Sequence, residues 1–468
     1  MYELKTNPWK HQWSALDYLM TNDQCALFTD MGTGKTKILI DTIVNRGFKR
    51  VLIVTTKKSC DVWNKEFDIH SNIPKNLRFK LDELSTSDKV SKVRETFDRD
   101  KISQQIRVYI VNYDSVWREP FASLVLKLPW DCVICDESHR IKTPSSKACR
   151  FLSRLSSKVK YRYIMSGTPV SEAPTDIYGQ YKFLKPEVFG TNFGNFKSLY
   201  VNIDPVRSAR CGFPVLDSKN PYKNLDDLNK RMYSCAFYAD STVKLPPVVH
   251  ITKEVKLSSK AQKVYKELLK EGVYENSKGL VETNNILTLY TRLQQLLSGY
   301  LPMESLDFSK KFRLWFDKSK IKELETLIED LPKTTPIVVF AKYRQDFKLI
   351  KRLCKKQGRR YGEISGSCNN YKDWNSNKID LIAVQYNSGS ESIDLTRSQY
   401  CIYYSHTFSY GLYLQSLKRT HRPGQKGRVT YYHLISVLDK GQTVDQRIQQ
   451  AHEQKKNLVD YIMEMEKS

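Results

Sequence analysis

The 468-residue sequence lacks long apolar runs. No stretch approaches the ~18 consecutive apolar residues that a membrane-spanning helix needs. Residues 1–5 also lack the apolar core of a signal peptide. Together with a mean hydropathy of -0.53, these absences argue against a membrane protein and predict a cytoplasmic location, or a nuclear one in a eukaryote.

The ten cysteines lack the regular spacing of a disulfide or zinc framework. Cys132 and Cys135 form the one close pair, inside the apolar run CVIC. Residues three apart on a strand point to opposite faces, which is a poor start for zinc ligation. Because no second CxxC is present, we expect these cysteines to be reduced core residues.

Acidic residues are few beside basic ones, 51 against 76, and the formal net charge is +25. An excess of this size is typical of proteins that bind polyanions, although it also serves solubility. It favours nucleic acid as a partner without indicating which kind. At ~150 residues per domain the length predicts about three domains, and two large ones fit equally well.

A glycine-bearing turn at residues 29–36 follows a short apolar run at residues 25–28 and precedes an apolar-periodic segment. Strand, turn and helix in this order are the setting of a phosphate-binding loop, although Thr29 stands where the pattern GxxxxGK[ST] has a glycine. Glycines let backbone N–H groups converge on phosphate oxygens at a helix N-terminus. We expect Lys35 to reach the β- and γ-phosphates of ATP and the Thr36 hydroxyl to hold Mg²⁺. The candidate nucleotide-binding residues of this turn are Gly32, Thr33, Gly34, Lys35 and Thr36.

A second polar site follows the apolar run at residues 132–135. Asp136 and Glu137 end this predicted strand, and His139 completes the pattern Asp-Glu-x-His. In a Walker B arrangement the aspartate holds Mg²⁺ through its water shell, and the glutamate orients and activates the attacking water. Because the motif follows Lys35 in an alternating α/β pattern, it strengthens the prediction of an ATP and Mg²⁺ site.

Other polar residues lie near the predicted phosphate loop or at strand ends. Gln12, upstream of the loop, has an amide whose donor and acceptor suit the adenine edge, although a solvent-facing glutamine is the commoner case. Thr55, Lys57 and Lys58 end one predicted strand, and Tyr113 lies at the end of the next. Ligands of open α/β sheets lie at the carboxyl ends of strands, so we consider these four residues candidates for nucleic-acid contacts. Ordinary solvated loops are the alternative.

A second α/β module begins near residue 318, where apolar runs again predict buried strands. Arg419 and Arg422 are three apart on a predicted helix that stops at Pro423-Gly424, and hence on one face. Two forked guanidinium groups presented together suit a phosphate, and one placed opposite the phosphate loop would act as an arginine finger. A salt-bridged surface helix is the alternative.

Taken in chain order, the motifs DMGTGKT, TTKKS, DESHRIK, SGTP, VVF and QSLKRTHRPGQ resemble those of the superfamily-two helicase-like ATPases, specifically the SWI/SNF-type DNA translocases. The resemblance spans about residues 8–448. It implies an α/β fold of two RecA-like lobes, each a parallel sheet flanked by helices, with ATP between them and a mainly helical insertion. We therefore expect an ATP-binding lobe at residues 1–185, the insertion at 186–310 and a helicase C-terminal lobe at 311–468. The resemblance places Lys35, Thr36, Asp136 and Glu137 on the first lobe and Arg419 and Arg422 on the second.

The resemblance also implies a nucleic-acid-stimulated ATPase that moves along double-stranded DNA without obligatory strand separation. It would remodel DNA in replication, recombination or repair, with branched intermediates among its substrates. Two alternatives stay open: a strand-separating DNA or RNA helicase, and an ATP-regulated DNA-binding clamp with little turnover. The sequence shows no clear wedge hairpin for a helicase. The presence of Lys35, Glu137 and both arginines argues against a clamp.

Two segments depart from the family pattern. Residues 389–395 read GSESIDL where the family has GGLGINL, so Gly389 is the residue of this motif that we expect to keep a nucleotide contact. Residues 235–240 read CAFYAD in place of an arginine-rich element. We find no room for a further targeting module. This economy predicts a near-minimal motor in the cytoplasm of a bacterial or phage-infected cell.

Overall fold

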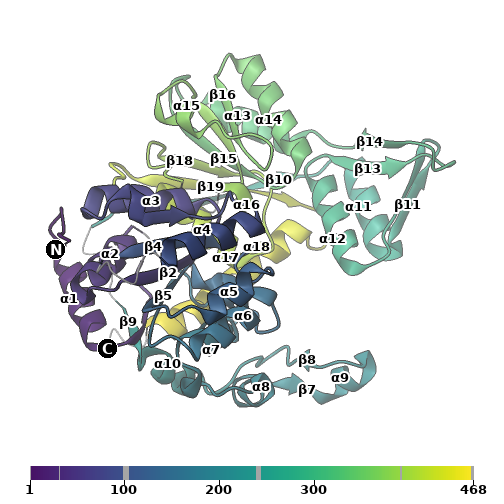
Figure 1. Ribbon diagram of the computed structural model, residues 1–468. Coiled ribbons are helices and arrows are strands. Elements are labelled where there is room, and N and C mark those ends of the chain that lie inside the picture. Colours follow the sequence, from purple (N-terminus) through teal and green to yellow (C-terminus); the bar gives the residue numbers. More distant parts are fainter. Residues whose placement is uncertain (1, 31, 99–104, 239–243, 390–392, 465–468) are drawn as a thin grey trace. The chain divides into compact units, whose positions relative to one another are not determined.

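The computed structural model describes residues 2–30, 32–98, 105–238, 244–389 and 393–464. The chain divides into two compact units (Figure 1). Unit 1 comprises the described residues up to Lys244 and the end of the last helix from Asn457, and unit 2 comprises residues 245–456. No helix in the described ranges is long and apolar enough to cross a bilayer.

Unit 1 is built on a seven-stranded sheet with the order β3-β4-β2-β5-β6-β1-β9. Every neighbouring pair runs parallel. Strands buried on both faces of a sheet are near-continuous apolar runs, and β2 and β5 have this composition. The strands are β1 (Gln24–Leu27), β2 (Arg50–Thr55), β3 (Arg78–Lys80), β4 (Arg107–Asn112), β5 (Cys132–Asp136), β6 (Tyr161–Met165) and β9 (Ala236–Phe237).

Helices cover both faces of this sheet: α1 (Lys10–Thr21), α2 (Lys35–Arg46), α3 (Ser59–His70), α4 (Thr86–Asp98), α5 (Phe121–Lys127), α6 (Lys147–Ser156) and α7 (Asp176–Leu184). Alternate strand residues point into two separate cores, as the two-residue period of a strand requires. Ile53 packs with α1, α2 and α3, whereas Leu52 packs with α4 to α7. Cys132 and Cys135 likewise lie in opposite cores, which confirms that they diverge.

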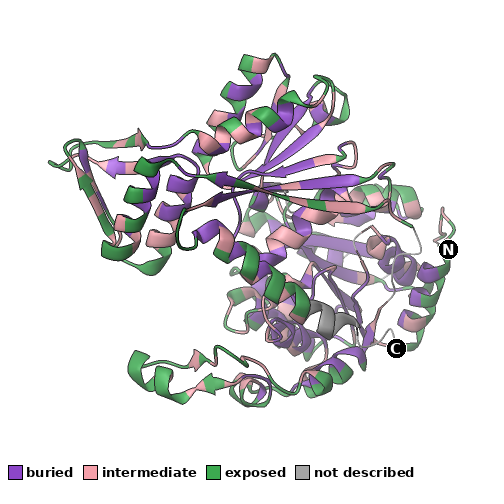
Figure 2. Cartoon of the chain, turned by 180° about the vertical axis from the view of Figure 1, so that it is seen from behind, coloured by how far each residue is buried: buried purple, intermediate pink, exposed green. Residues whose placement is uncertain are grey.

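An extension follows α7 in unit 1. Its aromatic side chains Phe189, Phe196 and Tyr200 are buried in the core that α4 to α7 share. Figure 2 shows buried residues along the strands and many exposed residues in the outer part of this extension. Its elements are α8 (Phe193–Tyr200), β7 (Ile203–Asp204), α9 (Pro205–Cys211), β8 (Val215–Leu216) and α10 (Leu225–Tyr233). Short 3-10 helices lie at η1 (Lys75–Leu77), η3 (Ser138–Ile141) and η4 (Pro186–Val188).

Unit 2 has a six-stranded parallel sheet with the order β10-β19-β18-β15-β17-β16. Its strands are β10 (Val248–Lys256), β15 (Ile337–Ala341), β16 (Tyr361–Ile364), β17 (Leu381–Gln385), β18 (Tyr400–Tyr403) and β19 (Val429–Val437). Its helices are α13 (Ser319–Glu329), α14 (Arg344–Gln357), α15 (Tyr371–Asn375), α16 (Tyr386–Gly389) and α17 (Tyr410–Thr420). Helices α13 and α14 pack on one face of the sheet, and α15 and α17 pack on the other.

Unit 2 also contains an antiparallel sheet with the order β11-β12-β13-β14. It packs with α11, α12 and the start of α18 around a separate core. Its elements, with the last helix of the chain, are α11 (Ser259–Glu271), β11 (Val273–Asn276), β12 (Gly279–Glu282), α12 (Ile286–Leu297), β13 (Tyr300–Glu304), β14 (Lys311–Trp315) and α18 (Val444–Glu464).

The predicted fold class is confirmed, because two parallel sheets of seven and six strands form the RecA-like lobes. Residues 186–310 contain helices α8 to α12 and also three strands of the antiparallel sheet, β11 to β13, which the sequence did not predict. The structure divides residues 186–310 between the two units at Lys244 and Leu245. The three-part division at 185 and 310 stays a prediction.

Candidate functional site

The predicted phosphate loop connects β1 to α2. Gly32 and Gly34 have φ values of 81° and 79°, a left-handed conformation that glycine adopts without steric cost. A Cβ atom on Gly34 would lie 2.3 Å from Nε2 of Gln12, so a side chain at this position would displace the Gln12 amide. Met31 lies outside the described residues. Helix α2 begins at Lys35, directly after Gly34, so its first-turn N–H groups lie at the loop.

The side chain of Lys35 is held by its own loop. Its ammonium group donates to the carbonyls of Thr29 (2.7 Å) and Asp30 (2.8 Å). The Thr33 hydroxyl donates to the Asp30 carbonyl and lies 2.8 Å from the Thr29 hydroxyl. Thr36 lies half-buried in the first turn of α2. The loop therefore presents a cation and a helix N-terminus together, which is an arrangement for binding an anion.

Gln12 braces this loop. Its Nε2 donates to the Thr33 carbonyl at 2.9 Å, and its Oε1 accepts from the Trp9 backbone N–H at 2.8 Å. Nε2 of His11 lies 2.9 Å from the same Thr33 carbonyl oxygen. Both ends of the Gln12 amide are thus engaged with protein atoms, and its recognition of adenine stays a prediction. His11 was not found by sequence reasoning, because no local pattern indicates its distant partner.

Asp136 lies at the carboxyl end of β5 and is 8% exposed. Its Oδ2 accepts hydrogen bonds from the Thr55 hydroxyl (2.7 Å) and from Nε1 of Trp63 (3.0 Å). Burial and then the neighbouring Glu137 carboxylate raise the pKa of Asp136 to about 6, against the opposing effects of these hydrogen bonds and of Lys35. Lys35 of the phosphate loop is thus the cation that favours the charged form of Asp136.

Glu137 is one of the few non-glycine residues with a left-handed backbone, at φ 50° and ψ 52°. Its Oε2 lies 3.3 Å from Nδ1 of His139. The same His139 nitrogen lies 3.3 Å from the Ser166 hydroxyl, which accepts from the Thr168 backbone N–H. The Walker B turn is therefore connected to the SGTP loop that follows β6.

Gln180 on α7 makes a second connection between these two loops. Its Oε1 accepts from the Ser138 hydroxyl at 2.6 Å, and its Nε2 donates to the Pro169 carbonyl at 2.7 Å. Gln180 is fully buried. Sequence reasoning missed it, because a single glutamine in a helix carries no signal of two partners in separate loops.

The hydroxyl groups of Thr55 and Tyr113, which we considered candidates for nucleic-acid contacts, lie against Asp136. Both hydroxyls are buried and directed at Asp136: Thr55 donates to its carboxylate, and Tyr113 donates to its backbone carbonyl at 2.7 Å. Both hydroxyls therefore support Asp136, and a contact of either residue with nucleic acid stays a prediction. Lys57 and Lys58 are exposed beyond the end of β2 and remain the candidates for nucleic-acid contact.

The arginines of unit 2 differ from the helical pair that we expected. Arg419 lies in the last turn of α17, is 4% exposed, and donates to the Ile393 carbonyl at 3.3 Å. The helix ends at Thr420, so Arg422 lies outside it and the argument for a shared helical face is wrong. The reason is Pro423, which disfavours helical geometry at the residue before it. Beyond the helix, His421 is held at 2.8 Å by the Pro246 carbonyl.

Gly389 is the last residue of α16. Ser390, Glu391 and Ser392 of the variant GSESIDL motif lie outside the described residues, as do residues 239 and 240 of CAFYAD. Unit 1 therefore brings the phosphate loop, Gln12, Asp136 and Glu137 into one site, whereas Gly389, Arg419 and Arg422 are located in unit 2.

Two family models match the chain: the SNF2-related domain at residues 9–299 and the helicase conserved C-terminal domain at residues 319–424. The chain is similar to the DNA repair and recombination protein RDH54 of Saccharomyces cerevisiae, with 23% identity over 88% of this chain and 47% of that protein. It is 22% identical to the DNA repair and recombination protein RAD54B of Homo sapiens, over 96% of this chain and 53% of that protein. The chain thus spans about half the length of these relatives. Among solved structures it is similar to the Sulfolobus solfataricus SWI2/SNF2 ATPase core in complex with dsDNA, with a TM-score of 0.42 and 19% identity over 99% of this chain and 94% of that one.

Proposed function

The chain belongs to the SNF2-related family of helicase-like ATPases, and from this premise we propose that it uses ATP hydrolysis to move along double-stranded DNA without obligatory strand separation. Family membership makes it an ATP-hydrolysing enzyme. The single observation that carries the proposal is the set of contacts around Asp136 and Glu137. They connect the Walker B turn to the SGTP loop through His139 and Ser166.

ATP would bind with its phosphates against the N-terminus of α2. Lys35 would exchange its two loop carbonyls for phosphate oxygens, and the first-turn N–H groups of α2 would add donors. Gln12 would hold the loop in shape, and its amide would contact the adenine edge. The glycine at position 34 keeps this loop close to Gln12.

The residues present also fit Mg²⁺. Asp136 and Thr36 offer carboxylate and hydroxyl oxygens, which are the hard ligands that this ion prefers. The pKa of Asp136 is raised by burial and by Glu137, and a divalent cation would offset both effects. When bound, the ion would neutralise charge on the β- and γ-phosphates.

Glu137 is proposed as the residue that orients the attacking water and accepts its proton. His139 lies close enough to hold the Glu137 carboxylate and to pass the state of the site to Ser166. Arg419 and Arg422 of unit 2 are proposed to stabilise the charge that develops on the γ-phosphate, a role worth about 10³–10⁵ in rate in nucleotidases that use such an arginine.

Double-stranded DNA is proposed as the partner for two reasons. The net charge of +25 favours a polyanion, and Lys57 and Lys58 are exposed beyond a strand end of unit 1. The relatives RDH54 and RAD54B are named as DNA repair and recombination proteins. Branched replication or recombination intermediates are the substrates that this likeness favours.

Phosphate release tests the proposal. The wild-type chain is assayed without nucleic acid and with duplex DNA, single-stranded DNA or RNA, at low and moderate salt. Stimulation by duplex DNA above the other nucleic acids is expected, and it should fall steeply with salt because binding depends on phosphate contacts. Greater stimulation by single strands or RNA would favour a strand-separating helicase, and no turnover under any condition would favour a clamp.

Two variants test the site assignment in the same assay. Lys35→Ala and Glu137→Gln should each abolish turnover, because one removes a phosphate contact and the other removes the base. DNA affinity should stay within about twofold of wild type, since neither residue is a proposed phosphate contact for DNA. Glu187→Gln, at an exposed glutamate in unit 1, is the matched control. Full turnover in either site variant would contradict the assignment.

A further inference from the structure

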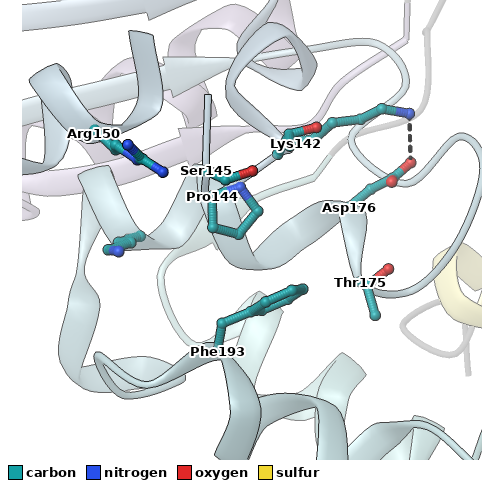
Figure 3. Close-up of a pocket in the computed structure, with 9 residues that line it drawn as sticks. Lys142, Pro144, Ser145, Arg150, Thr175, Asp176 and Phe193 are labelled. Carbon is teal, nitrogen blue, oxygen red and sulfur yellow. Dashed lines mark hydrogen bonds and ion pairs between the residues drawn. The ribbon is translucent and has the colours of Figure 1, made fainter. Parts of the chain in front are cut away.

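Two adjoining hollows lie along α6 and α7 of unit 1, outside the residues assigned to the nucleotide. The first has a volume of about 450 Å³ and is lined by Arg150, Lys182 and Phe193 among others (Figure 3). The second has a volume of about 560 Å³ and is lined by Arg150, Ser153, Arg154 and Lys182. Because they share Arg150 and Lys182, the hollows form one continuous basic surface, which we name the α6–α7 groove.

Helix α6 supplies the arginines of this groove. Its buried face includes Phe151 and Leu155, whereas Arg150 and Arg154 are exposed. Like charges four residues apart on a helix repel and destabilise it. Within the described part of the chain, Arg150, Arg154 and Lys182 form no ion pair of the kind that joins Lys142 to Asp176. No ion pair within the described residues therefore offsets the charge of these three side chains.

Asp176 is the acidic residue in the lining of the first hollow, and its charge is already engaged. Its Oδ2 lies 3.2 Å from Nζ of Lys142 (Figure 3). The same oxygen accepts from the backbone N–H groups of Ser171 and Glu172. Lys142 and Asp176 thus neutralise one another. Arg150 and Lys182 leave the hollow with a net positive charge.

Phe193 adds an aromatic surface to the positive charge. It is half-buried, with its ring packed 4.9 Å from the ring of Tyr178 and 6.2 Å from that of Phe196. Figure 3 shows the Phe193 ring projecting into the hollow below Pro144. Thr143, Ser145 and Thr175 add hydroxyl groups, which are common donors to phosphate oxygens. A basic groove with an aromatic ring on its wall is typical of single-strand binding, because phosphates follow the charge and bases stack on the ring.

We propose that the α6–α7 groove is a binding site for single-stranded nucleic acid, with phosphates on Arg150 and Lys182 and an unpaired base against Phe193. A hollow of about 450 Å³ has the size of a small-ligand site, which fits one nucleotide unit. The second hollow extends the charge beyond one nucleotide, which favours a strand over a free mononucleotide. The inference rests on the proposed DNA motor function and adds a contact for an unpaired segment of its substrate.

The test compares three variants of the full chain. Arg150→Gln with Lys182→Gln removes the two shared cations, and Phe193→Leu removes the aromatic ring. Lys65→Gln with Lys230→Gln removes the same charge from exposed positions on α3 and α10 of the same unit and serves as the matched control. Binding of a labelled single strand of about 16 nucleotides, and of a blunt duplex, is measured by fluorescence anisotropy as a function of salt.

The Arg150→Gln/Lys182→Gln variant should bind the single strand at least about 10-fold more weakly than the control does, with a salt slope shallower by about 1.4, because each single-strand phosphate contact contributes about 0.7. Phe193→Leu should weaken single-strand binding by about fivefold or more and leave the salt slope unchanged, because stacking involves no counterion. Both variants should keep duplex affinity and duplex-stimulated ATP hydrolysis within about twofold of wild type.

Four outcomes would overturn the inference. An equal loss of single-strand binding in the control variant would indicate a general effect of charge. An equal loss of duplex binding in the groove variants would indicate that the groove contacts duplex DNA. Displacement of the strand by AMP in a Lys35→Ala background would indicate a mononucleotide site, and displacement by poly-glutamate alone would indicate an acidic protein partner. The motor function fails separately, through the absence of duplex-stimulated hydrolysis in the wild-type chain.

Discussion

Asp136 of unit 1 and Asp346 of unit 2 are both buried aspartates, and burial raises the pKa of each to about 6. Their surroundings differ. Each has a lysine nearby, but Asp136 also has a second carboxylate, Glu137, beside it. Asp346 accepts a hydrogen bond from the Ser405 hydroxyl at 2.7 Å and one from the Tyr343 backbone N–H at the start of α14. Burial alone therefore raises the pKa of an aspartate without marking a functional site, and the neighbouring Glu137 carboxylate is what distinguishes Asp136.

The largest expected effect is a difference in ATP turnover between variants of the two aspartates. Asp136→Asn should lower duplex-stimulated ATP hydrolysis by about 10²-fold or more, because it removes the charge proposed to hold Mg²⁺. Asp346→Asn should keep turnover per folded molecule within about twofold of wild type, since its carboxylate supports a helix start. Steady-state phosphate release, normalised to the folded fraction, measures both. An equal loss of ATP hydrolysis in the two variants would contradict the distinction between a functional Asp136 and a structural Asp346.

The second effect concerns stability. The pKa of Asp346 is 3.8 in its ordinary state and about 6 in the fold, so the folded chain binds the proton more tightly. Its contribution is fully present below pH 3.8 and is lost as the pH rises through 6. That loss amounts to about 3 kcal/mol for a shift of this size.

Asp346→Asn should remove this part of the pH dependence between pH 4 and 6. The difference in unfolding free energy between variant and wild type, from urea denaturation across that interval, measures the effect. A constant difference across the interval would show that Asp346 titrates normally.

The third effect concerns the pH at which the candidate site binds Mg²⁺ and nucleotide. Nucleotide binding that depends on Mg²⁺ should be lost on acidification near pH 6 in the wild-type chain, as Asp136 takes up a proton. Because Glu137 raises the pKa of Asp136, Glu137→Gln should move this loss to a lower pH. Asp346→Asn should not change the pH at which this binding is lost. Binding of a fluorescent ATP analogue, titrated with and without Mg²⁺ at each pH, reports the midpoint. An unchanged midpoint in the Glu137→Gln variant would show that Glu137 does not raise the pKa of Asp136.

The smallest expected effect tests the support of Asp136. Thr55→Val removes one hydrogen bond to its carboxylate and should lower hydrolysis by about 10-fold, since hydrogen bonds to charged groups are worth about 1.5–3 kcal/mol. DNA affinity should not change, because the Thr55 hydroxyl is buried. Thr42→Val, at a buried threonine that donates within α2, is the control for packing. Weaker DNA binding with intact hydrolysis would restore Thr55 as a nucleic-acid contact.

Much of the fold follows from local pattern. The buried strands were predicted because apolar runs of parallel strands are distinctive, and the phosphate loop and Walker B turn were predicted because glycine, lysine and paired acids occur at fixed spacings. The contacts that hold these residues could not be predicted in the same way. Trp63 and Gln180 act on partners 73 and 42 residues away in the chain, which local spacing does not encode.

The errors also have physical causes. Arg422 was placed on a helix because the pattern before it is helical, yet α17 ends two residues earlier. The antiparallel sheet of unit 2 was missed because its strands are short and two of them, β11 and β14, have no buried residue. Their apolar period is therefore weak.

The left-handed backbone of Glu137 sets folding stability against activity at this position. A non-glycine residue in that conformation costs about 1–3 kcal/mol of folding stability, and glycine would relieve the strain. Glu137→Gly should therefore produce a more stable protein that no longer turns over ATP. Glutamate at this position would thus lower folding stability in exchange for its proposed role in turnover.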